Sequence, residues 1–405
     1  MSTTFRPIVP DELPAFARAS SMGFGESNDW FERELPWASS SIERAIAGFE
    51  GDSVVATSRN YPLDMTVPGG AALHTAGVSA VTVLPTHRRQ GFLREMMTWL
   101  LYDAVEHEET LAILTASDAA IYGRFGFGPT TRALSVRMAK HEMEFARPRP
   151  EGRLRLVDAD EARKVEPDVF ERVRRASPGA VSRPDLWWYH HYEHEGSGIR
   201  FDALYESPSG SVDGYVLYTV RDKWTATGAA HSLAIRELIA CTPEAEHALW
   251  RFVGEVDLVR TISCHSVRID TPLPWLLTSL RAVNVESIHD YLWTRLLDVP
   301  ATLGARTYAV PGRLVLAIDD PGRRGGAADG SFALEGGPDG AAVTRTDASP
   351  DLVCDVAAAS TAWLGGVRWT ELAAAGLVEE RTRGALATAD AMFASTPLPH
   401  GFTWF

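Results

Sequence analysis

The sequence predicts a mixed α/β (α+β) fold arranged as consecutive domains, and three observations support this expectation. The chain has 405 residues, which is more than one hydrophobic core ordinarily serves. Segments with the apolar period of strands alternate with segments that have the period of helices. A proline-rich basic stretch at 145–152 interrupts this alternation, as a linker between domains would.

Domains are therefore expected at 1–144, 152–300 and 301–405. The second domain repeats the strand and helix order of the first in a weaker form. The third contains a Gly/Asp-rich stretch at 319–330 and ends in an alanine-rich helical segment followed by a short aromatic tail. A loop explains the Gly/Asp-rich stretch better than a calcium site does, because the spacing of an EF-hand is missing.

In the first domain, the longest expected strand is rich in β-branched and small residues, and the helix after it carries apolar residues at helical spacing. The expected elements are a short first strand, a helix at 10–20, strands at 53–61 and 63–67 with a turn near Pro62, a strand at 73–84, a helix at 89–106 and a strand at 111–115.

The same criteria apply to the other two domains. In the second domain they predict strands at 201–205, 215–220, 234–241 and 260–264, with a helix at 243–256. In the third domain they predict strands at 313–318 and 331–334, with helices at 369–375 and 382–393.

The strongest chemical signal is the run Val81-Thr82-Val83-Leu84-Pro85-Thr86-His87-Arg88-Arg89-Gln90-Gly91-Phe92-Leu93-Arg94. A strand ends, the chain turns at Pro85, and a helix begins in a basic turn that contains Gly91. The N–H groups and dipole of a helix N-terminus suit a pyrophosphate, and a glycine lets phosphates approach the backbone closely. Arg88, Arg89 and Arg94 add positive charge. The alternative is an ordinary turn with surface arginines, but the order of these features favours a phosphate site.

This run resembles the acetyl-CoA motif of GNAT acetyltransferases, and its form at 85–94 is closer to that of the Eis (enhanced intracellular survival) family. The general GNAT motif carries a small residue at the position of Leu93, whereas the Eis family accepts a large apolar one. A second match is the segment from Ser117 to Gly128. A third is the plan of the chain, which implies tandem GNAT folds, the second degenerate, and a C-terminal domain like sterol carrier protein that ends at Phe405.

The resemblance implies a role for each residue that matches a family motif. Acetyl-CoA would be the cosubstrate, Tyr122 the general acid, and the terminal carboxylate of Phe405 the general base. The implied coenzyme-binding residues are Val81, Thr82, Val83, Arg88, Arg89, Gln90, Gly91, Phe92, Leu93, Arg94, Ser117 and Asp118.

These implied roles agree with the chemistry of acetyl transfer to an amine. A backbone N–H near Val83 can donate to the developing oxyanion, and the Tyr122 hydroxyl can supply a proton to the departing thiolate. A carboxylate can accept the proton of the ammonium. The alternatives are that Tyr122 only packs between a strand and a helix, that the glycine-rich run at 123–128 is only a turn, and that the end of the chain is frayed. The aromatic character of 402–405 favours an anchored end.

The second domain lacks a comparable phosphate site. Its equivalent turn is Cys241-Thr242-Pro243-Glu244-Ala245-Glu246, which places carboxylates where phosphates would sit and contains no glycine or arginine. We therefore expect a degenerate acetyltransferase copy that has a structural role or shapes the substrate cavity.

An acidic and aromatic segment at 24–34 lies where GNAT proteins place an acceptor-binding helix and loop. Its carboxylates, with apolar walls from nearby indoles, suit a cationic amine. The alternative is an amphipathic surface helix with a solvated acidic face. The candidate substrate-binding residues are Phe24, Glu26, Asp29, Trp30 and Trp37.

The composition limits which binding partners and which cellular compartment are expected for this protein. A net charge of −14 repels nucleic acid and anionic membranes. No apolar run approaches the roughly 20 residues that span a bilayer, and the N-terminus lacks a secretory pattern, so a cytoplasmic protein is expected. Cys241, Cys264 and Cys354 are expected to be buried reduced thiols. His190 and His194 lie one helical turn apart, but the aromatic residues around them favour a packed helix, so no metal is expected.

The sequence therefore predicts an acetyl-CoA-dependent N-acetyltransferase, and the resemblance to the Eis family implies that it acts on primary amines of cationic small molecules (aminoglycoside or polyamine-like) or of lysine side chains. Direct attack within a ternary complex is the expected mechanism, and the resemblance implies a homo-oligomer, specifically a hexamer. The alternative is a non-catalytic acetyl-CoA-sensing or lipid-binding protein on a vestigial GNAT scaffold. The intact coenzyme motif weighs against lipid binding, and Tyr122 with the terminal carboxylate of Phe405 distinguishes catalysis from sensing.

Overall fold

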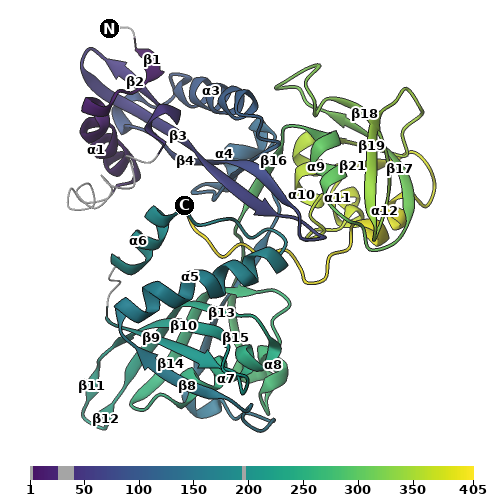
Figure 1. The fold of residues 1–405 in the computed structure, drawn as a ribbon. Coiled ribbons are helices and arrows are strands. Elements are labelled where there is room, and N and C mark those ends of the chain that lie inside the picture. The colour runs from purple at the N-terminus through teal and green to yellow at the C-terminus, as the bar shows by residue number, and fades with distance from the viewer. Residues whose placement is uncertain (1–2, 26–40, 194–197) are drawn as a thin grey trace.

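Three sheet-based lobes make up the protein (Figure 1). The computed structural model describes residues 3–25, 41–193 and 198–405. The tail after α12 (Ala385–Phe393) runs from the third lobe back to the junction of the other two, where the C-terminus lies (Figure 1). This return brings the end of the chain next to the first domain.

The first sheet has the strand order β1-β2-β3-β4-β5-β16-β6. Its strands β4 and β5 are parallel, and helix α3 connects them, whereas β3 pairs with β4 in the antiparallel sense. The elements are β1 (Thr4–Pro7), α1 (Leu13–Phe24), β2 (Ala45–Glu50), β3 (Ser53–Thr66), β4 (Ala72–Val83), α3 (Phe92–Glu106), β5 (Leu111–Leu114), α4 (Ala119–Tyr122), β6 (Gly128–Pro129) and β16 (Trp293–Leu296).

The expected hairpin with a turn near Pro62 is wrong, because β3 continues through this residue as one strand. Pro62 pairs with Ala76 of β4, but β2 accompanies β3 only as far as Arg59. Beyond Arg59, β4 is the only named strand that pairs with β3 among the described residues, and an isolated bridge joins Met65 to Val181 on the other side. A proline is tolerated at such an edge, where its missing N–H group interrupts no ladder.

The second sheet has the order β15-β7-β14-β13-β10-β9-β8 and repeats the core of the first. Strands β10 and β13 are antiparallel, β13 and β14 are parallel, and α7 connects the parallel pair. The elements are β7 (Arg132–Ala139), β8 (Arg153–Val157), α5 (Ala159–Ala176), α6 (Asp185–Glu193), β9 (Ile199–Glu206), β10 (Val212–Arg221), β11 (Trp224–Thr225), β12 (Gly228–Ala229), β13 (His231–Ala240), α7 (Pro243–Glu255), β14 (Val259–Arg268), α8 (Leu273–Leu276) and β15 (Asn284–Asp290).

The first two sheets exchange strands. Strand β7 precedes the proline-rich stretch at 145–152 but pairs with β14 and β15 of the second sheet. Strand β16 follows the second sheet in sequence but pairs with β5 and β6 of the first. The domain limits at 1–144, 152–300 and 301–405 stay predictions about folding units, and this exchange ties the first two together.

The third sheet has the order β19-β18-β17-β20-β21. One continuous buried core joins it to the first domain, with Met65 and Leu111 packed in the same cluster as Phe332 and Trp363. The elements are α9 (Val299–Ala305), β17 (Gly312–Asp319), β18 (Gly330–Gly337), β19 (Gly340–Arg345), β20 (Leu352–Asp355), α10 (Val356–Ala362), α11 (Trp369–Ala374), β21 (Val378–Glu380) and α12. The tail thus starts from a domain packed firmly against the first.

The structure bears on two expectations from composition, namely the lack of a membrane-spanning helix and the burial of the cysteines. Within the described ranges, no helix combines the length and the apolarity needed to cross a bilayer. The three cysteines are free; Cys264 and Cys354 are buried, and Cys241 is half-buried. Burial raises the pKa of Cys264 to about 11 and that of Cys354 to about 12, which makes both thiols poor nucleophiles.

Candidate active site

The parallel strands of the first sheet separate before they end. Pairing between β4 and β5 runs from Thr75 to Gly77 and stops there, although β4 continues to Val83. A bulge bends β4 at Ala80, which has a φ of 52°, and the Thr57 hydroxyl donates to the Ala80 carbonyl at 2.7 Å. The β5-facing edge at 78–83 is therefore left open.

A cavity of about 730 Å³ lies along this edge and brings most of the predicted residues together. Within the described part of the chain, two predicted residues with assigned roles do not line it: Gln90, predicted to bind the coenzyme, and Phe405, predicted to be the base. The predicted residues that line the cavity are Phe24, Val81, Thr82, Val83, Arg88, Arg89, Gly91, Phe92, Leu93, Arg94, Ser117, Asp118 and Tyr122.

Helix α3 presents its N-terminus to the cavity. Gly91 is the N-cap, with a φ of 88°, and its carbonyl accepts from the N–H groups of Arg94 and Glu95 at 3.0 and 3.2 Å. The N–H groups of Phe92 and Leu93 precede these first intrahelical bonds. A Cβ atom added at Gly91 would meet no atom within 4 Å, so the space above the helix end is open. This geometry suits an anion.

The basic turn before α3 is held by side chains at its base. His87 hydrogen-bonds to Glu50 at 2.9 Å and to the Thr86 hydroxyl at 2.8 Å. Arg88 and Arg89 are exposed at the mouth of the cavity. The hydrogen bonds of His87 therefore fix the backbone of the turn. The exposed guanidinium groups of Arg88 and Arg89 add to the positive potential of the helix N-terminus.

Tyr122 lies at the end of α4 and also lines the cavity. The Asp118 carboxylate caps this helix by accepting from the Ala120 N–H group at 3.0 Å. Tyr122 is 5% exposed, and its ring meets the edge of Phe127 at a centroid distance of 6.2 Å. Burial raises the pKa of Tyr122, against a smaller opposing effect of a hydrogen bond with Ser117. The hydroxyl is therefore protonated at neutral pH.

The C-terminus lies at the end of β5. The Thr115 hydroxyl donates to a Phe405 main-chain oxygen at 3.0 Å. The Phe405 ring stacks on Trp187 of α6 with the centroids 5.7 Å apart, and it also lies against Gly77 of β4. The chain terminus is thus anchored between the first and second domains, and it lies next to the segment that continues to Asp118 and Tyr122.

Known proteins resemble the chain over its whole length. Acetyltransferase (GNAT) domain families match residues 4–130 and 179–296, and the sterol carrier protein domain family matches residues 299–400. The N-acetyltransferase Eis of Mycobacterium bovis is 36% identical over 411 residues, which cover 98% of each chain. A Streptomyces avermitilis protein named as an uncharacterized N-acetyltransferase is 37% identical, covering 97% of this chain and 96% of that protein. The crystal structure of Eis1 from Mycobacterium abscessus superposes with a TM-score of 0.88 at 31% identity and covers both chains fully.

The chain belongs to the Eis family. It is therefore an N-acetyltransferase with two GNAT domains followed by a domain like sterol carrier protein, and the predicted fold class is confirmed.

The second GNAT domain of this Eis-family chain differs at the equivalent helix end. The Thr242 hydroxyl caps α7 by accepting from the Ala245 N–H group at 3.1 Å. Glu244 and Glu246 lie in the first turn of this helix. The side-chain cap occupies one of the donors that an anion would need, and the carboxylates repel a phosphate. These features agree with the expected degenerate copy.

Several residues in or near the cavity are not among those predicted from the sequence. Gly23 is one: a Cβ atom there would lie 2.4 Å from the Thr82 side chain, so a glycine is needed for the end of α1 to approach β4. A glycine near the end of an expected helix was the available signal. Thr115 and Trp187 offered none, because their contacts with Phe405 depend on the tertiary fold. The additional lining residues are Gly23, His87, Ile121, Arg124 and Phe125.

The candidate substrate-binding residues begin at the end of α1. Phe24 lines the cavity at the end of α1 and is 47% exposed. The other candidate substrate-binding residues, Glu26, Asp29, Trp30 and Trp37, lie outside the described residues, as does His194.

Proposed function

We propose that this Eis-family enzyme transfers the acetyl group of acetyl-CoA to primary amines of cationic small molecules, aminoglycoside or polyamine-like, or of lysine side chains. The amine attacks directly within a ternary complex. One observation carries the proposal: a single cavity joins an open helix N-terminus with arginines around it to a buried, protonated Tyr122.

The residues around the cavity fit acetyl-CoA. The N-terminus of α3 and the guanidinium groups of Arg88, Arg89 and Arg94 would hold the pyrophosphate, and the open space over Gly91 leaves room for it. The unpaired edge at 81–83 offers backbone groups to an extended amide-containing arm. Gln90, Phe92 and Leu93 would contribute through the backbone of the same turn, with Ser117 and Asp118 on the far side.

Two groups would move protons. The hydroxyl of Tyr122 would protonate the departing thiolate, since burial keeps it protonated. The terminal carboxylate of Phe405, held beside β5 by Thr115, would accept the proton that the substrate ammonium loses, and the neutral amine would then attack the thioester carbonyl. The N–H of Val83 would donate to the oxyanion that develops on the carbonyl. No metal takes part in this proposal.

The net charge of the protein supports the proposed class of acceptor. The net charge of −14 attracts a cationic amine and repels nucleic acid and anionic membranes. Phe24 would form one wall of the acceptor path, with Glu26, Asp29, Trp30 and Trp37 as predicted partners. We also propose a cytoplasmic homohexamer from the family resemblance. Sedimentation of the pure protein as a monomer would contradict the assembly.

A coenzyme-thiol release assay against a panel of amines tests the function. The panel contains aminoglycosides, polyamines, a lysine peptide and neutral alcohols of similar size as controls. We expect release with cationic amines and none with the alcohols. Calorimetric binding of acetyl-CoA without release for any amine would instead identify a non-catalytic acetyl-CoA-binding protein.

A further inference from the structure

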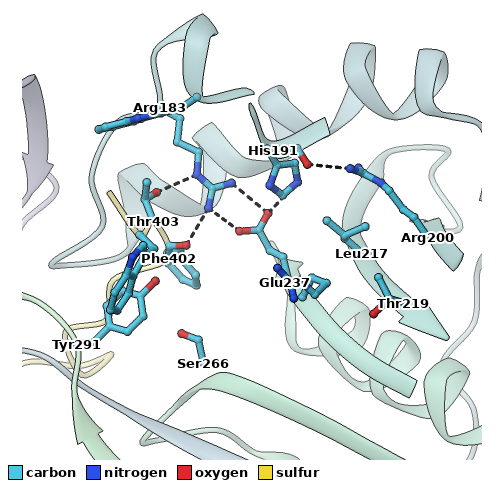
Figure 2. A pocket seen from close by; sticks show the side chains of 13 residues that line it. Arg183, His191, Arg200, Leu217, Thr219, Glu237, Ser266, Tyr291, Phe402 and Thr403 are labelled. Atoms are coloured by element: carbon cyan, nitrogen blue, oxygen red, sulfur yellow. Dashed lines mark hydrogen bonds and ion pairs between the residues drawn. The ribbon is translucent and has the colours of Figure 1, made fainter. Parts of the chain in front are cut away.

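The tail that ends at Phe405 is held mainly by the second domain. The Leu398 N–H group donates to Asp270 at 2.8 Å, and the His400 N–H group donates to the Pro178 carbonyl at 2.9 Å. Further along, Phe402, Thr403 and Trp404 line a cavity of about 310 Å³ on the second sheet (Figure 2). The terminus therefore depends on a domain that lacks the open helix end of the first.

The location of this second cavity repeats that of the first. Strands β13 and β14 pair as far as Ile235 and Cys264 and then separate. Glu237 and Ser266 lie beyond that point and line the smaller cavity together with the tail. Where the first pair of parallel strands opens onto the large cavity, the second pair opens onto the tail of the chain itself.

Arg183, just before α6, connects the tail to this site (Figure 2). Its Nε donates to the Thr403 hydroxyl at 2.8 Å, and one Nη donates to the Phe402 carbonyl at 2.8 Å. The same guanidinium forms two hydrogen bonds with Glu237, at 2.5 and 3.1 Å. One arginine therefore ties two consecutive tail residues to β13.

The guanidinium is itself fixed in place. Its side chain is 6% exposed and lies 4.0 Å from the centre of the Phe170 ring. The Tyr215 hydroxyl donates to Glu237 at 2.5 Å, which orients the carboxylate. Burial opposes the charge of Arg183, but Glu237 outweighs it and raises the pKa of the guanidinium. Charge-assisted hydrogen bonds of this kind are short and directional.

We propose that Arg183 is a positioning residue for acetyl transfer: it holds Phe402 and Thr403 so that the carboxylate of Phe405 stays at the end of β5. This inference rests on the proposed function, in which that carboxylate is the base. Two residues span at most about 7 Å, so fixing Thr403 confines the carboxylate to a small volume. A displacement of about 1 Å at a reacting group can cost about 100-fold in rate. The second GNAT domain thereby serves the reaction of the first.

Two substitutions test the clamp. Arg183→Lys keeps a positive charge but loses the fork that reaches Glu237 and the tail together. Thr403→Val removes the hydroxyl acceptor and leaves the ion pair of Arg183 with Glu237 intact. It therefore tests the clamp even if Arg183→Lys fails to fold. We expect kcat to fall at least about tenfold for the arginine variant and several-fold for the threonine variant, with acetyl-CoA affinity within about twofold of the parent.

Arg174→Lys is the matched control. Arg174 lies in the same domain, its side chain is 8% exposed, and it forms two hydrogen bonds with Glu171, at 2.6 and 2.8 Å. It also donates to a hydroxyl of the first domain, that of Thr66, at 3.1 Å. Its own side chain is as little exposed as that of Arg183 and it pairs with a carboxylate in the same way, although Glu171 is 37% exposed and Glu237 is 9% exposed. Arg174 makes no contact with the tail among the hydrogen bonds of the described residues, and its variant is expected to retain the parental kcat.

A second measurement follows the tail directly. Carboxypeptidase digestion of the full-length proteins with saturating acetyl-CoA, monitored by mass spectrometry, reports how often Phe405 is released from its place. We expect removal of Phe405 to accelerate at least about tenfold in Arg183→Lys and to stay unchanged in Arg174→Lys. Unchanged removal in both Arg183→Lys and Thr403→Val would overturn the clamp, and so would faster removal with a parental kcat.

A protein extended by Gly-Ser-Gly after Phe405 separates this proposal from the function on which it rests. If the extended protein is inactive while both clamp variants keep full activity, the terminal carboxylate is the base and Arg183 does not position it. If the extended protein is fully active, the terminal carboxylate is not the base, and that part of the proposed function is wrong. Arg183 is then not a positioning residue for acetyl transfer.

Discussion

Gly91→Asp places a negative charge where the coenzyme pyrophosphate is expected. Gly91 is the N-cap of α3, and an added Cβ atom would meet nothing within 4 Å, so the new carboxylate fits sterically but enters the open space. About 6 Å from one phosphate charge, at an effective dielectric constant near 40, the repulsion is about 1.4 kcal/mol. That repulsion weakens acetyl-CoA binding about tenfold, and repulsion from both phosphates weakens it about 100-fold.

Backbone strain must be separated from this repulsion. Gly91 has a φ of 88° and a ψ of −3°, a left-handed conformation that costs other residues roughly 1–2 kcal/mol. Gly384 is a matched control, because it is the N-cap of α12 with a φ of 92° and a ψ of −3°, and an added Cβ atom there also meets nothing within 4 Å. Gly384→Asp should show comparable strain in thermal unfolding and parental affinity for acetyl-CoA.

Isothermal titration calorimetry with acetyl-CoA gives the decisive comparison. Gly91→Ala, which adds strain without charge, should bind within about threefold of the parent, and Gly91→Asp should bind about 10- to 100-fold more weakly. Unchanged affinity of folded Gly91→Asp would refute the assignment of the pyrophosphate site to the N-terminus of α3.

Two further predictions concern protonation. Tyr122→Phe should lower kcat about 100-fold with little change in acetyl-CoA affinity, because the ring keeps its packing against Phe127; steady-state kinetics with a parental kcat would exclude Tyr122 as the acid. Burial lowers the pKa of His400 to about 3, whereas a histidine in the unfolded chain titrates near 6.5. The folded state binds fewer protons between these values, so the free energy of unfolding should fall as the pH drops below 6.5, by up to about 1.4 kcal/mol per pH unit. Urea unfolding from pH 7 to 5 should show a shallower decline for His400→Phe, and an equal decline would contradict this account.

The coenzyme side of the site was predictable from sequence because its determinants are local. Within one short run the sequence shows the end of β4, the basic turn, Gly91 and the apolar face of α3, and each has a direct physical meaning. Most of these residues line one cavity. Gln90 matches the motif by its position, but within the described chain it does not line that space.

The remaining features depend on contacts between distant segments. The hydrogen bond from Thr115 to Phe405 joins positions 290 residues apart, and no local pattern encodes it. The exchange of β7 and β16 between the two sheets could not be predicted either, because the sequence of each strand is compatible with both sheets. Pro62 was misinterpreted for the same reason: whether a proline ends a strand depends on which edges are paired, which only the tertiary fold decides.

The most direct test of the central claim moves the terminal carboxylate and leaves the rest of the chain unchanged. Coenzyme-thiol release is measured with a reactive amine for the parent, for the protein extended by Gly-Ser-Gly after Phe405, and for Phe405→Leu. The account predicts that the extension lowers turnover at least about 100-fold while acetyl-CoA affinity stays within about twofold, and that Phe405→Leu, which keeps the carboxylate, retains most activity. Full activity of the extended protein would contradict it, and the base would then have to be a side chain such as Glu26, Asp29 or Asp118.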